Sequence, residues 1–339
     1  MPFVDVHSHV VPFDFPAAPS AAVQARWPCM RCGATAGEGT VMIGDKPFRK
    51  LDDRSWNASR RIEDMDRDGV SMQVLSPMPE LLSYWLDTDD AQLLCDRSNH
   101  QIADMIATAP RRFRGLGAVA LQDPEYAAAM LPRLKRDFGL SGIEIGSNIN
   151  GTLLGEPRFD PFWAAAEAEG LSIFVHALHP IAAKPLPDNM AFTGFTLFPV
   201  DVAMAAASLM MAGVPDRFPA LRLGFSHGGG ALAALLGRLD LGWERSEGFG
   251  GKAARRPSDQ ARSIYYDTNV YDPVFLRHIV NDVAPGRVFA GTDYPYEIMQ
   301  TAPAAFVRGL GLDATQVASV SVGAASAYLD EDLAQLARS

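Results

Sequence analysis

Short β-rich runs alternate with longer helical stretches along most of this chain, and that order restricts the folds open to it. The runs expected as strands are residues 3–7, 71–75, 115–121, 142–145, 171–176, 221–226, 264–268 and 287–290. The segments expected as helices are 58–68, 90–109, 125–138, 161–169, 202–211, 231–241, 273–282 and 315–329. Repeated strand-helix-strand units imply an α/β fold with parallel strands, and eight units favour closure into a (β/α)8 TIM barrel. A doubly wound open sheet is the alternative.

Residues 10–53 interrupt the alternation and are expected to form a small insertion after the first strand. The stretch is rich in Pro, Gly and Ala, and residues 39–50 have the pattern of a hairpin. Loops that follow the strands build the active sites of such barrels. We therefore expect a single barrel domain over 1–339, with 10–53 as a lid over the active site.

Composition narrows the classes of partner. The 339 residues carry a net charge of −10, and their Lys and Arg residues are scattered, which argues against nucleic acid. We find no apolar stretch near the roughly 20 residues of a spanning helix and no signal-peptide pattern at the N-terminus. The expectation is a cytoplasmic protein without a membrane partner.

The three cysteines are Cys29, Cys32 and Cys95. An odd count argues against a disulfide framework and fits a reducing compartment. Cys29 and Cys32 form a Cys-x-x-Cys, which is typical of half a zinc knuckle, of a redox pair or of two incidental thiols. No second Cys-x-x-Cys completes a four-thiolate site, so the incidental interpretation is favoured.

Metal-binding residue types gather at the ends of the expected strands. His7 and His9 end the first strand, and side chains two apart on a strand point the same way, so the pair can chelate one ion. Taken alone, the pair could equally be two half-buried structural histidines. His176, His227 and Asp293 follow the fifth, sixth and eighth strands, where the catalytic groups of a barrel converge. A carboxylate there needs a cationic partner, so the five together favour a metal site.

This order of His-x-His, His, His and Asp resembles the amidohydrolase superfamily, and in particular its 2-amino-3-carboxymuconate-6-semialdehyde decarboxylase family. The motifs that carry the resemblance are Asp5-Val6-His7-Ser8-His9, Pro47-Phe48-Arg49, Arg61-Ile62-Glu63-Asp64-Met65-Asp66, Ser83-Tyr84-Trp85, Pro110-Arg111-Arg112-Phe113, His227-Gly228-Gly229-Gly230, Gly237-Arg238 and Gly291-Thr292-Asp293-Tyr294-Pro295. The resemblance implies a non-oxidative carboxy-lyase acting on a conjugated or aromatic carboxylic acid such as a carboxymuconate semialdehyde. It also implies a homodimer that uses one divalent metal, most often Zn2+ with Mn2+ as the alternative, and no organic cofactor.

The same resemblance assigns roles to the clustered residues. His7, His9, His176 and Asp293 correspond to the metal ligands, and His227 corresponds to the acid/base beside the metal-bound water. The chemistry agrees, because zinc lowers the pKa of bound water toward roughly 7, a range in which histidine also titrates.

Two arginines match the family's carboxylate-binding residues. Arg49 and Arg238 carry planar guanidinium groups suited to a bidentate carboxylate contact, and the resemblance implies that Arg238 acts across the dimer interface. Without the resemblance to this family, Arg49 would be read as a surface hairpin residue. Arg238 would then be a helix-surface partner of Asp240 or Glu244.

Several further residues are expected around a flat substrate. Phe48, Tyr84, Trp85 and Tyr296 are candidate aromatic walls, although each could equally pack in the core. The chain departs from the family after strand five, where His179 is a candidate substrate contact or a solvated loop residue. It departs again at Gly194 or Phe195, where the family has a tryptophan. Both changes indicate a related substrate, such as a hydroxy-carboxymuconate semialdehyde or an aromatic ortho-hydroxy acid.

Two other functions stay open on these residues. One is a metal-dependent hydrolase of a ring-cleavage product, lactone or amide, because the same metal chemistry can attack a carbonyl. The other is a binding protein that keeps the barrel without catalysis, because this fold carries many functions.

Overall fold

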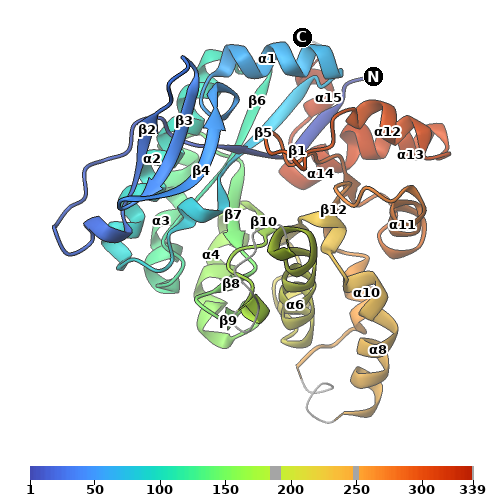
Figure 1. Cartoon of the computed structure of the whole chain (residues 1–339). Helices are drawn as coiled ribbons and strands as arrows, with labels where there is room; N and C mark the ends of the chain where they lie inside the picture. The colour runs from blue at the N-terminus through green and yellow to red at the C-terminus, as the bar shows by residue number, and fades with distance from the viewer. Residues whose placement is uncertain (184–191, 247–251, 338–339) are drawn as a thin grey trace.

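The computed structural model describes residues 1–183, 192–246 and 252–337. At its centre an eight-stranded parallel sheet runs in the order β1-β5-β6-β7-β10-β11-β12-β13 (Figure 1). These strands are β1 (Val4–Val10), β5 (Met72–Pro77), β6 (Phe113–Gly117), β7 (Gly142–Gly146), β10 (Ser172–His176), β11 (Arg222–Phe225), β12 (Tyr265–Asp267) and β13 (Val288–Phe289). The first strand meets the end of the last, since Val6 N–H donates to Ala290 O at 2.8 Å and His9 N–H to Tyr294 O at 2.7 Å. The predicted (β/α)8 barrel is therefore confirmed as a nearly closed barrel.

Helices cover the outside of the barrel (Figure 1). They are α1 (Ala58–Asp68), α2 (Thr88–Thr108), α3 (Pro124–Arg136), α4 (Asp160–Glu169), α6 (Phe198–Met211), α7 (Val214–Arg217), α8 (Leu232–Arg245), α10 (Pro257–Ala261), α11 (Pro273–His278), α12 (Pro303–Gly309), α13 (Ala314–Ala318), α14 (Ala324–Leu329) and α15 (Leu333–Leu336). The expected helix at 315–329 consists of α13, a π turn and α14 in succession. Helix α12 lies where no helix was predicted.

Local sequence explains where these helices begin and end. The Asn57 side chain accepts hydrogen bonds from the first N–H groups of α1, and Gly69, with a φ of 73°, ends the helix in the left-handed conformation. Asp123 caps α3 in the same way, ahead of Pro124 in the first turn. These residues determine where α1 begins and ends and where α3 begins.

A β-bulge near the end of β1 determines where its histidines point. The pairing with β5 shifts by one residue, so that Val6 and His7 both lie opposite Val74. Val6 packs in the same interior cluster as Phe174, and the His7 ring lies 5.1 Å from the Phe174 ring. Strict alternation would place Val6 and His7 on opposite faces, so the bulge is what brings both into the barrel.

The barrel interior beneath these histidines is apolar and closed at its far end by α14. Its side chains come from alternate positions of the strands, together with Tyr328 and Leu329 of α14. They include Val4, Val6, Met72, Val74, Leu116, Phe174, Tyr265 and Phe289. Such a filled interior is typical of this fold and leaves only the opposite end for a polar site.

The insertion after β1 forms a three-stranded antiparallel sheet of β2 (Pro28–Cys32), β3 (Glu38–Ile43) and β4 (Lys46–Asp52). Strands β3 and β4 form the hairpin expected at 39–50, and β2 adds a strand that was not predicted. Val41 of this sheet packs with Met78 and Leu81, which follow β5, and Phe48 and Tyr296 border the same cluster. The insertion therefore contacts loops at the C-terminal ends of barrel strands. A second, two-stranded sheet joins β8 (Asn148–Ile149) to β9 (Thr152–Leu153).

The helical stretch Thr193–Met211 is longer and more apolar than predicted from the sequence. Residues Thr193–Met211 form 19 consecutive helical residues with a mean hydropathy of 1.5, long and apolar enough to cross a membrane by length and composition alone. The statement that no stretch approaches this length is therefore wrong. In the structure, 44% of this apolar stretch is buried, and Val202, Ala205 and Leu209 of α6 pack in the main hydrophobic core.

Candidate metal centre

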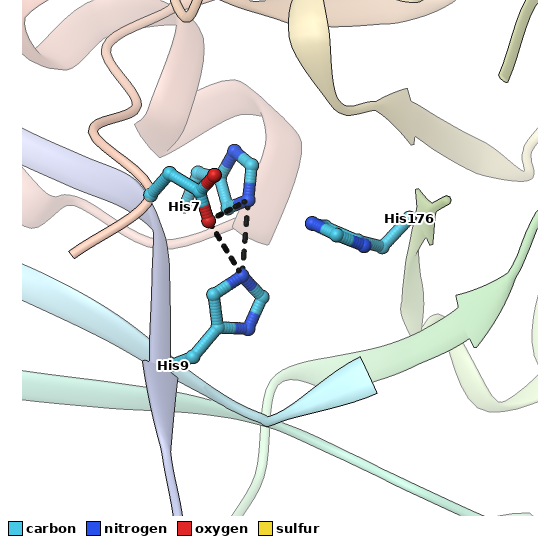
Figure 2. A group of neighbouring side chains, drawn as sticks. His7, His9 and His176 are labelled. Atoms are coloured by element: carbon cyan, nitrogen blue, oxygen red, sulfur yellow. Dashed lines mark hydrogen bonds and ion pairs between the residues drawn. The ribbon is translucent and has the colours of Figure 1, made fainter. Parts of the chain in front are cut away.

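Four predicted ligands converge at the C-terminal end of the barrel. His7, His9, His176 and Asp293 are buried, and each offers one ligand atom within 4.8 Å of the others. His7 Nε2 lies 3.1 Å from His9 Nε2, and Asp293 Oδ1 lies 3.4 Å and 3.2 Å from these two atoms. Figure 2 shows the three imidazoles turned toward one another, with His176 approaching from the side opposite His7 and His9. The barrel thus builds a compact set of three nitrogens and one oxygen.

Each histidine in this set is held through its Nδ1 atom. His7 Nδ1 lies 2.6 Å from Asp267 Oδ2, His9 Nδ1 lies 2.9 Å from Pro77 O, and His176 Nδ1 lies 2.9 Å from Ala177 O. Since a carbonyl or carboxylate oxygen accepts, each Nδ1 carries the proton, and each Nε2 presents a lone pair to the centre. This is the tautomer that a metal ion requires.

The charges in the cluster call for a cation. Burial raises the pKa of Asp293, but His7 and His9 outweigh it and hold the pKa well below the usual value. Burial likewise raises the pKa of Asp267, and the hydrogen bond from His7 brings it below its usual value. Burial lowers the pKa of His7, yet Asp293 and Asp267 together raise it to about 10. A buried site that binds a proton this tightly is one where a metal can replace the proton.

The donor atoms fit one divalent ion. His176 Nε2 and Asp293 Oδ1 are buried without a hydrogen-bond partner in the structure, although buried polar atoms seldom stay unpaired. Burial and the neighbouring His9 and His7 also lower the pKa of His176 well below its usual value, so its ring is neutral and able to bind a metal. Three imidazoles and one carboxylate suit Zn2+ and Mn2+ and leave a position for water or substrate.

His227 lies beside the cluster without belonging to it. Its Nε2 is 4.0 Å from Asp293 Oδ2, and its ring centroid is 5.2 Å from that of His176. Burial and the nearby His7 lower its pKa, which keeps the ring neutral and able to accept a proton near pH 7. It begins a left-handed turn, with φ values of 56° at His227 and 61° at Gly228.

The insertion brings Arg49 and Phe48 to the same end of the barrel. Arg49 Cζ lies 4.6 Å from the ring centroid of Tyr296 and 5.8 Å from that of Phe48. The guanidinium pairs with Glu80, Nη2 to Oε1 at 3.0 Å. Burial lowers the pKa of Arg49, but Glu80 and other acidic neighbours raise it above its usual value, so the arginine keeps its charge.

Of the other residues predicted around the substrate, His179 and Trp85 contact each other and Tyr84 packs in the core. His179 lies 4.9 Å from Trp85, ring centroid to ring centroid, and burial lowers its pKa. Tyr84 is buried, and its hydroxyl accepts the Gly146 N–H at 3.1 Å, which matches the core-packing alternative. Phe198 was not predicted, yet its ring centroid lies 6.4 Å from those of His176 and His227.

Three predicted features lie away from the cluster in this single chain. Arg238 is exposed on α8, which packs against α6 and α10 and projects from the barrel (Figure 1). Phe195 is 65% exposed in the turn before α6. Cys29 and Cys32 are exposed free thiols three residues apart on β2, where residues at this spacing face opposite sides of the strand, and the incidental interpretation stays a prediction.

Sequence reasoning missed three carboxylates near the cluster, of which Asp267 and Glu144 are buried and Glu80 is half-buried. Asp267 accepts from His7, Glu80 pairs with Arg49, and Glu144 Oε2 lies 3.6 Å from His9 Nδ1. Burial raises the pKa of Glu144 to about 7. Asp267 and Glu144 end or occupy barrel strands, so the signal that located His176 could have found them.

Comparison with known proteins agrees with this geometry. A family model described as amidohydrolase matches residues 4–332. The chain belongs to the amidohydrolase family. This amidohydrolase is 30% identical over 310 residues to 2-amino-3-carboxymuconate-6-semialdehyde decarboxylase from Dictyostelium discoideum. The aligned region covers 91% of this chain and 85% of that protein.

Solved structures of similar proteins extend the comparison. The crystal structure of 5-carboxyvanillate decarboxylase from Sphingomonas paucimobilis matches with a TM-score of 0.82 and 26% identity, over 97% of this chain and 99% of that one. A 5-carboxyvanillate decarboxylase from Novosphingobium aromaticivorans, in complex with manganese and 4-hydroxy-3-methoxy-5-nitrobenzoic acid, matches with a TM-score of 0.73 and 26% identity over 82% of each chain. By these relationships the amidohydrolase described here is a metal-dependent carboxy-lyase, which favours decarboxylation over the hydrolase alternative.

Proposed function

We propose that this amidohydrolase removes CO2 from a flat conjugated or aromatic carboxylic acid at a single Zn2+ or Mn2+ ion. The observation that carries the proposal is the buried set of three Nε2 atoms and one Asp293 oxygen, with His227 Nε2 beside it. His7, His9, His176 and Asp293 would hold the ion. When bound, a divalent ion supplies a Lewis acid that draws electron density toward a substrate oxygen.

His227 is the proton donor and acceptor in this proposal. Decarboxylation requires the carbon that bears the carboxylate to become tetrahedral, so that the electrons of the breaking C–C bond have an acceptor. His227, whose ring is neutral at rest, takes up a proton from solvent at Nε2 and passes it to that carbon. The bond to the carboxylate then breaks, and its electron pair returns to the conjugated system as CO2 leaves. The ring of His227 is 12% exposed, so it can recover a proton from solvent.

Aromatic and charged side chains near the cluster support a flat anionic substrate. Tyr296, Phe198 and Phe48 present ring surfaces near the metal ligands or near Arg49. Arg49 is the carboxylate-binding group, since a guanidinium fork matches the two oxygens of a carboxylate. The substrate classes that fit are carboxymuconate semialdehydes and ortho-hydroxybenzoates, and Trp85 with His179 forms a further aromatic pair for either.

Arg238 serves a neighbouring subunit in this proposal. It is exposed on α8, a helix that projects from the barrel, and in this proposal its guanidinium enters the active site of a second copy of the chain. A homodimer would then complete each active site, as cyclic dimers commonly do.

The test combines metal analysis with a substrate panel. Purified protein is analysed for metal and then loaded separately with Zn2+ and Mn2+. CO2 release is followed with 5-carboxyvanillate, 2,6-dihydroxybenzoate and 2-amino-3-carboxymuconate semialdehyde. We expect release from at least one of these acids that depends on the added ion and disappears with a chelator. Water-derived oxygen in the product, without CO2 release, would instead establish hydrolysis.

A further inference from the structure

Asp267 occupies the last position of β12 and lies directly between two elements of the site. It is completely buried, and no step of the proposed reaction uses it. Its Oδ2 atom lies 2.6 Å from His7 Nδ1 and accepts the backbone N–H of His227 at 3.0 Å. Its Oδ1 atom accepts the backbone N–H groups of Gly228 at 2.7 Å and Asn269 at 3.0 Å. One carboxylate thus binds both a metal ligand and the turn that carries His227.

The turn needs this support because of its backbone conformation. His227 has a φ of 56°, a left-handed conformation that a residue with a Cβ atom seldom adopts without compensation. Gly228 continues the turn with a φ of 61°, and its N–H points to the same carboxylate. Two successive N–H groups that converge on one anion are a recognised way of stabilising such a backbone.

The packing around Asp267 is equally specific. A Cβ atom at Gly291 would lie 2.8 Å from both the Asp267 and the His7 Cβ atoms, closer than real side chains approach. The absence of a side chain at Gly291 therefore allows β1 and β12 to bring His7 and Asp267 into contact. Gly291 also lies two residues before Asp293, so the same close approach joins three strand ends of the site.

We propose that Asp267 is a positioning residue that sets the metal ligand His7 and the acid/base His227 at the same time. By accepting from His7 Nδ1, it keeps the proton there and leaves Nε2 free for the ion. By accepting the N–H groups of His227 and Gly228, it holds the turn so that His227 Nε2 stays beside Asp293. The first effect is independent of the reaction, whereas the second rests on the function proposed above for His227.

The Asp267→Asn variant separates these effects because each carboxylate oxygen accepts two hydrogen bonds. An amide nitrogen cannot accept, so one of the two pairs is lost whichever way the amide turns. With the nitrogen toward His7, the ring must carry its proton on Nε2, where it opposes metal binding. With the nitrogen toward Gly228, the turn loses its anchor.

Metal affinity is measured for the full-length protein by competition with a chelator, using Mn2+ or Zn2+ alone. We expect Asp267→Asn to weaken binding by roughly 10- to 100-fold. At saturating metal its kcat stays below that of the wild type, because His227 remains displaced. The matched control is Asp272→Asn, which changes another carboxylate that caps backbone N–H groups five residues later. It should bind metal as the wild type does.

Three outcomes would overturn the proposal. An affinity within about twofold of the wild type in both Asp267→Asn and Asp267→Ala, the second of which leaves no acceptor for His7 in either orientation, would remove the role at His7. Full recovery of kcat at saturating metal would remove the role at His227. A lower melting temperature of the metal-free protein with unchanged metal affinity and kcat would make Asp267 merely structural. Absence of CO2 release from every acid tested would contradict the proposed function but leave the affinity result intact.

A measurement on the wild type covers the case in which the variant does not fold. Nitrogen-15 NMR of histidine side chains in the zinc-loaded protein distinguishes Nδ1–H from Nε2–H tautomers, and the His7 signals are assigned by their loss in His7→Gln. We expect Nδ1–H at His7. An Nε2–H tautomer there would contradict the proposal.

Discussion

The ring of Tyr296 stacks on the ring of His9, with centroids 5.2 Å apart and 25° between the planes. Arg49 lies over the Tyr296 ring, and Glu80 binds Arg49 in turn. These contacts link the metal cluster to the charged residues of the insertion.

Glu80→Gln is expected to improve binding of an anionic substrate. The substitution removes the negative charge opposite Arg49 but keeps the side-chain shape. The KM for an acid that the enzyme decarboxylates should fall about fivefold, equivalent to about 1 kcal/mol. Glu244→Gln, which removes an equivalent charge beside Arg256, serves as the control. An unchanged or higher KM for Glu80→Gln would show that Arg49 does not bind the substrate anion.

His227→Ala is expected to retain metal and lose turnover. The residue lies outside the set of four ligands, and removal of an acid/base group costs at least about 100-fold in kcat. Metal content and kcat are measured on the same preparation. His278→Ala removes an exposed histidine paired with Asp282 and should leave both quantities unchanged. Near-normal kcat in His227→Ala would exclude its catalytic role.

Removal of the metal should destabilise the protein, because the ion binds only to the folded cluster. At a free metal concentration about 1,000-fold above Kd, linkage predicts a loss of about 4 kcal/mol on chelation. Differential scanning calorimetry with and without chelator measures it. His176→Ala should abolish the effect, since its Nε2 is one of the four ligand atoms. A melting temperature insensitive to the chelator would argue against a metal centre here.

Complementation between inactive variants tests whether Arg238 acts across subunits. Arg49→Ala and Arg238→Ala are purified separately, then unfolded and refolded together. If dimers form at random, half are mixed and one of their two sites is intact, so activity should recover to about a quarter of the wild type. No recovery in refolded mixtures, with the wild type refolding normally, would place Arg238 outside the neighbouring site.

Asp216 provides a pH prediction away from the metal. Burial raises its pKa, but the hydrogen bond from Arg255, at 2.5 Å, and backbone N–H groups lower it below the usual 3.8. The folded pKa lies below the unfolded one, so the stabilisation is present above pH 3.8 and is lost as pH falls through the folded value.

Comparison of the wild type with Asp216→Asn measures this effect. The difference in the free energy of unfolding should be about 1.5 kcal/mol at pH 7 and should shrink steadily below pH 4. Urea unfolding across this pH range provides the values. A difference that grows toward low pH would contradict the assigned direction of the shift.

Much of the fold followed from local patterns. Alternating β-rich and helical stretches predicted the parallel barrel, because hydrophobic periodicity and capping act within a few residues. Helix α12 was missed because it is short and lies in a connection rich in small residues. The apolar length of 193–211 was underestimated because a helix was predicted over 202–211 only, whereas the helical stretch begins at Thr193.

The sequence by itself determined which residues reach the metal centre, because a residue that ends a parallel barrel strand must lie at the C-terminal face. That rule placed His7, His9, His176 and Asp293 correctly. Only the tertiary structure decided which way they point. The bulge opposite Val74 turns His7 into the barrel, and it depends on the register with β5, which no local pattern encodes. The contacts of Asp267 with His7 and of Glu80 with Arg49 were decided in the same way. Each joins segments far apart in the chain, and burial at close range selects the partner.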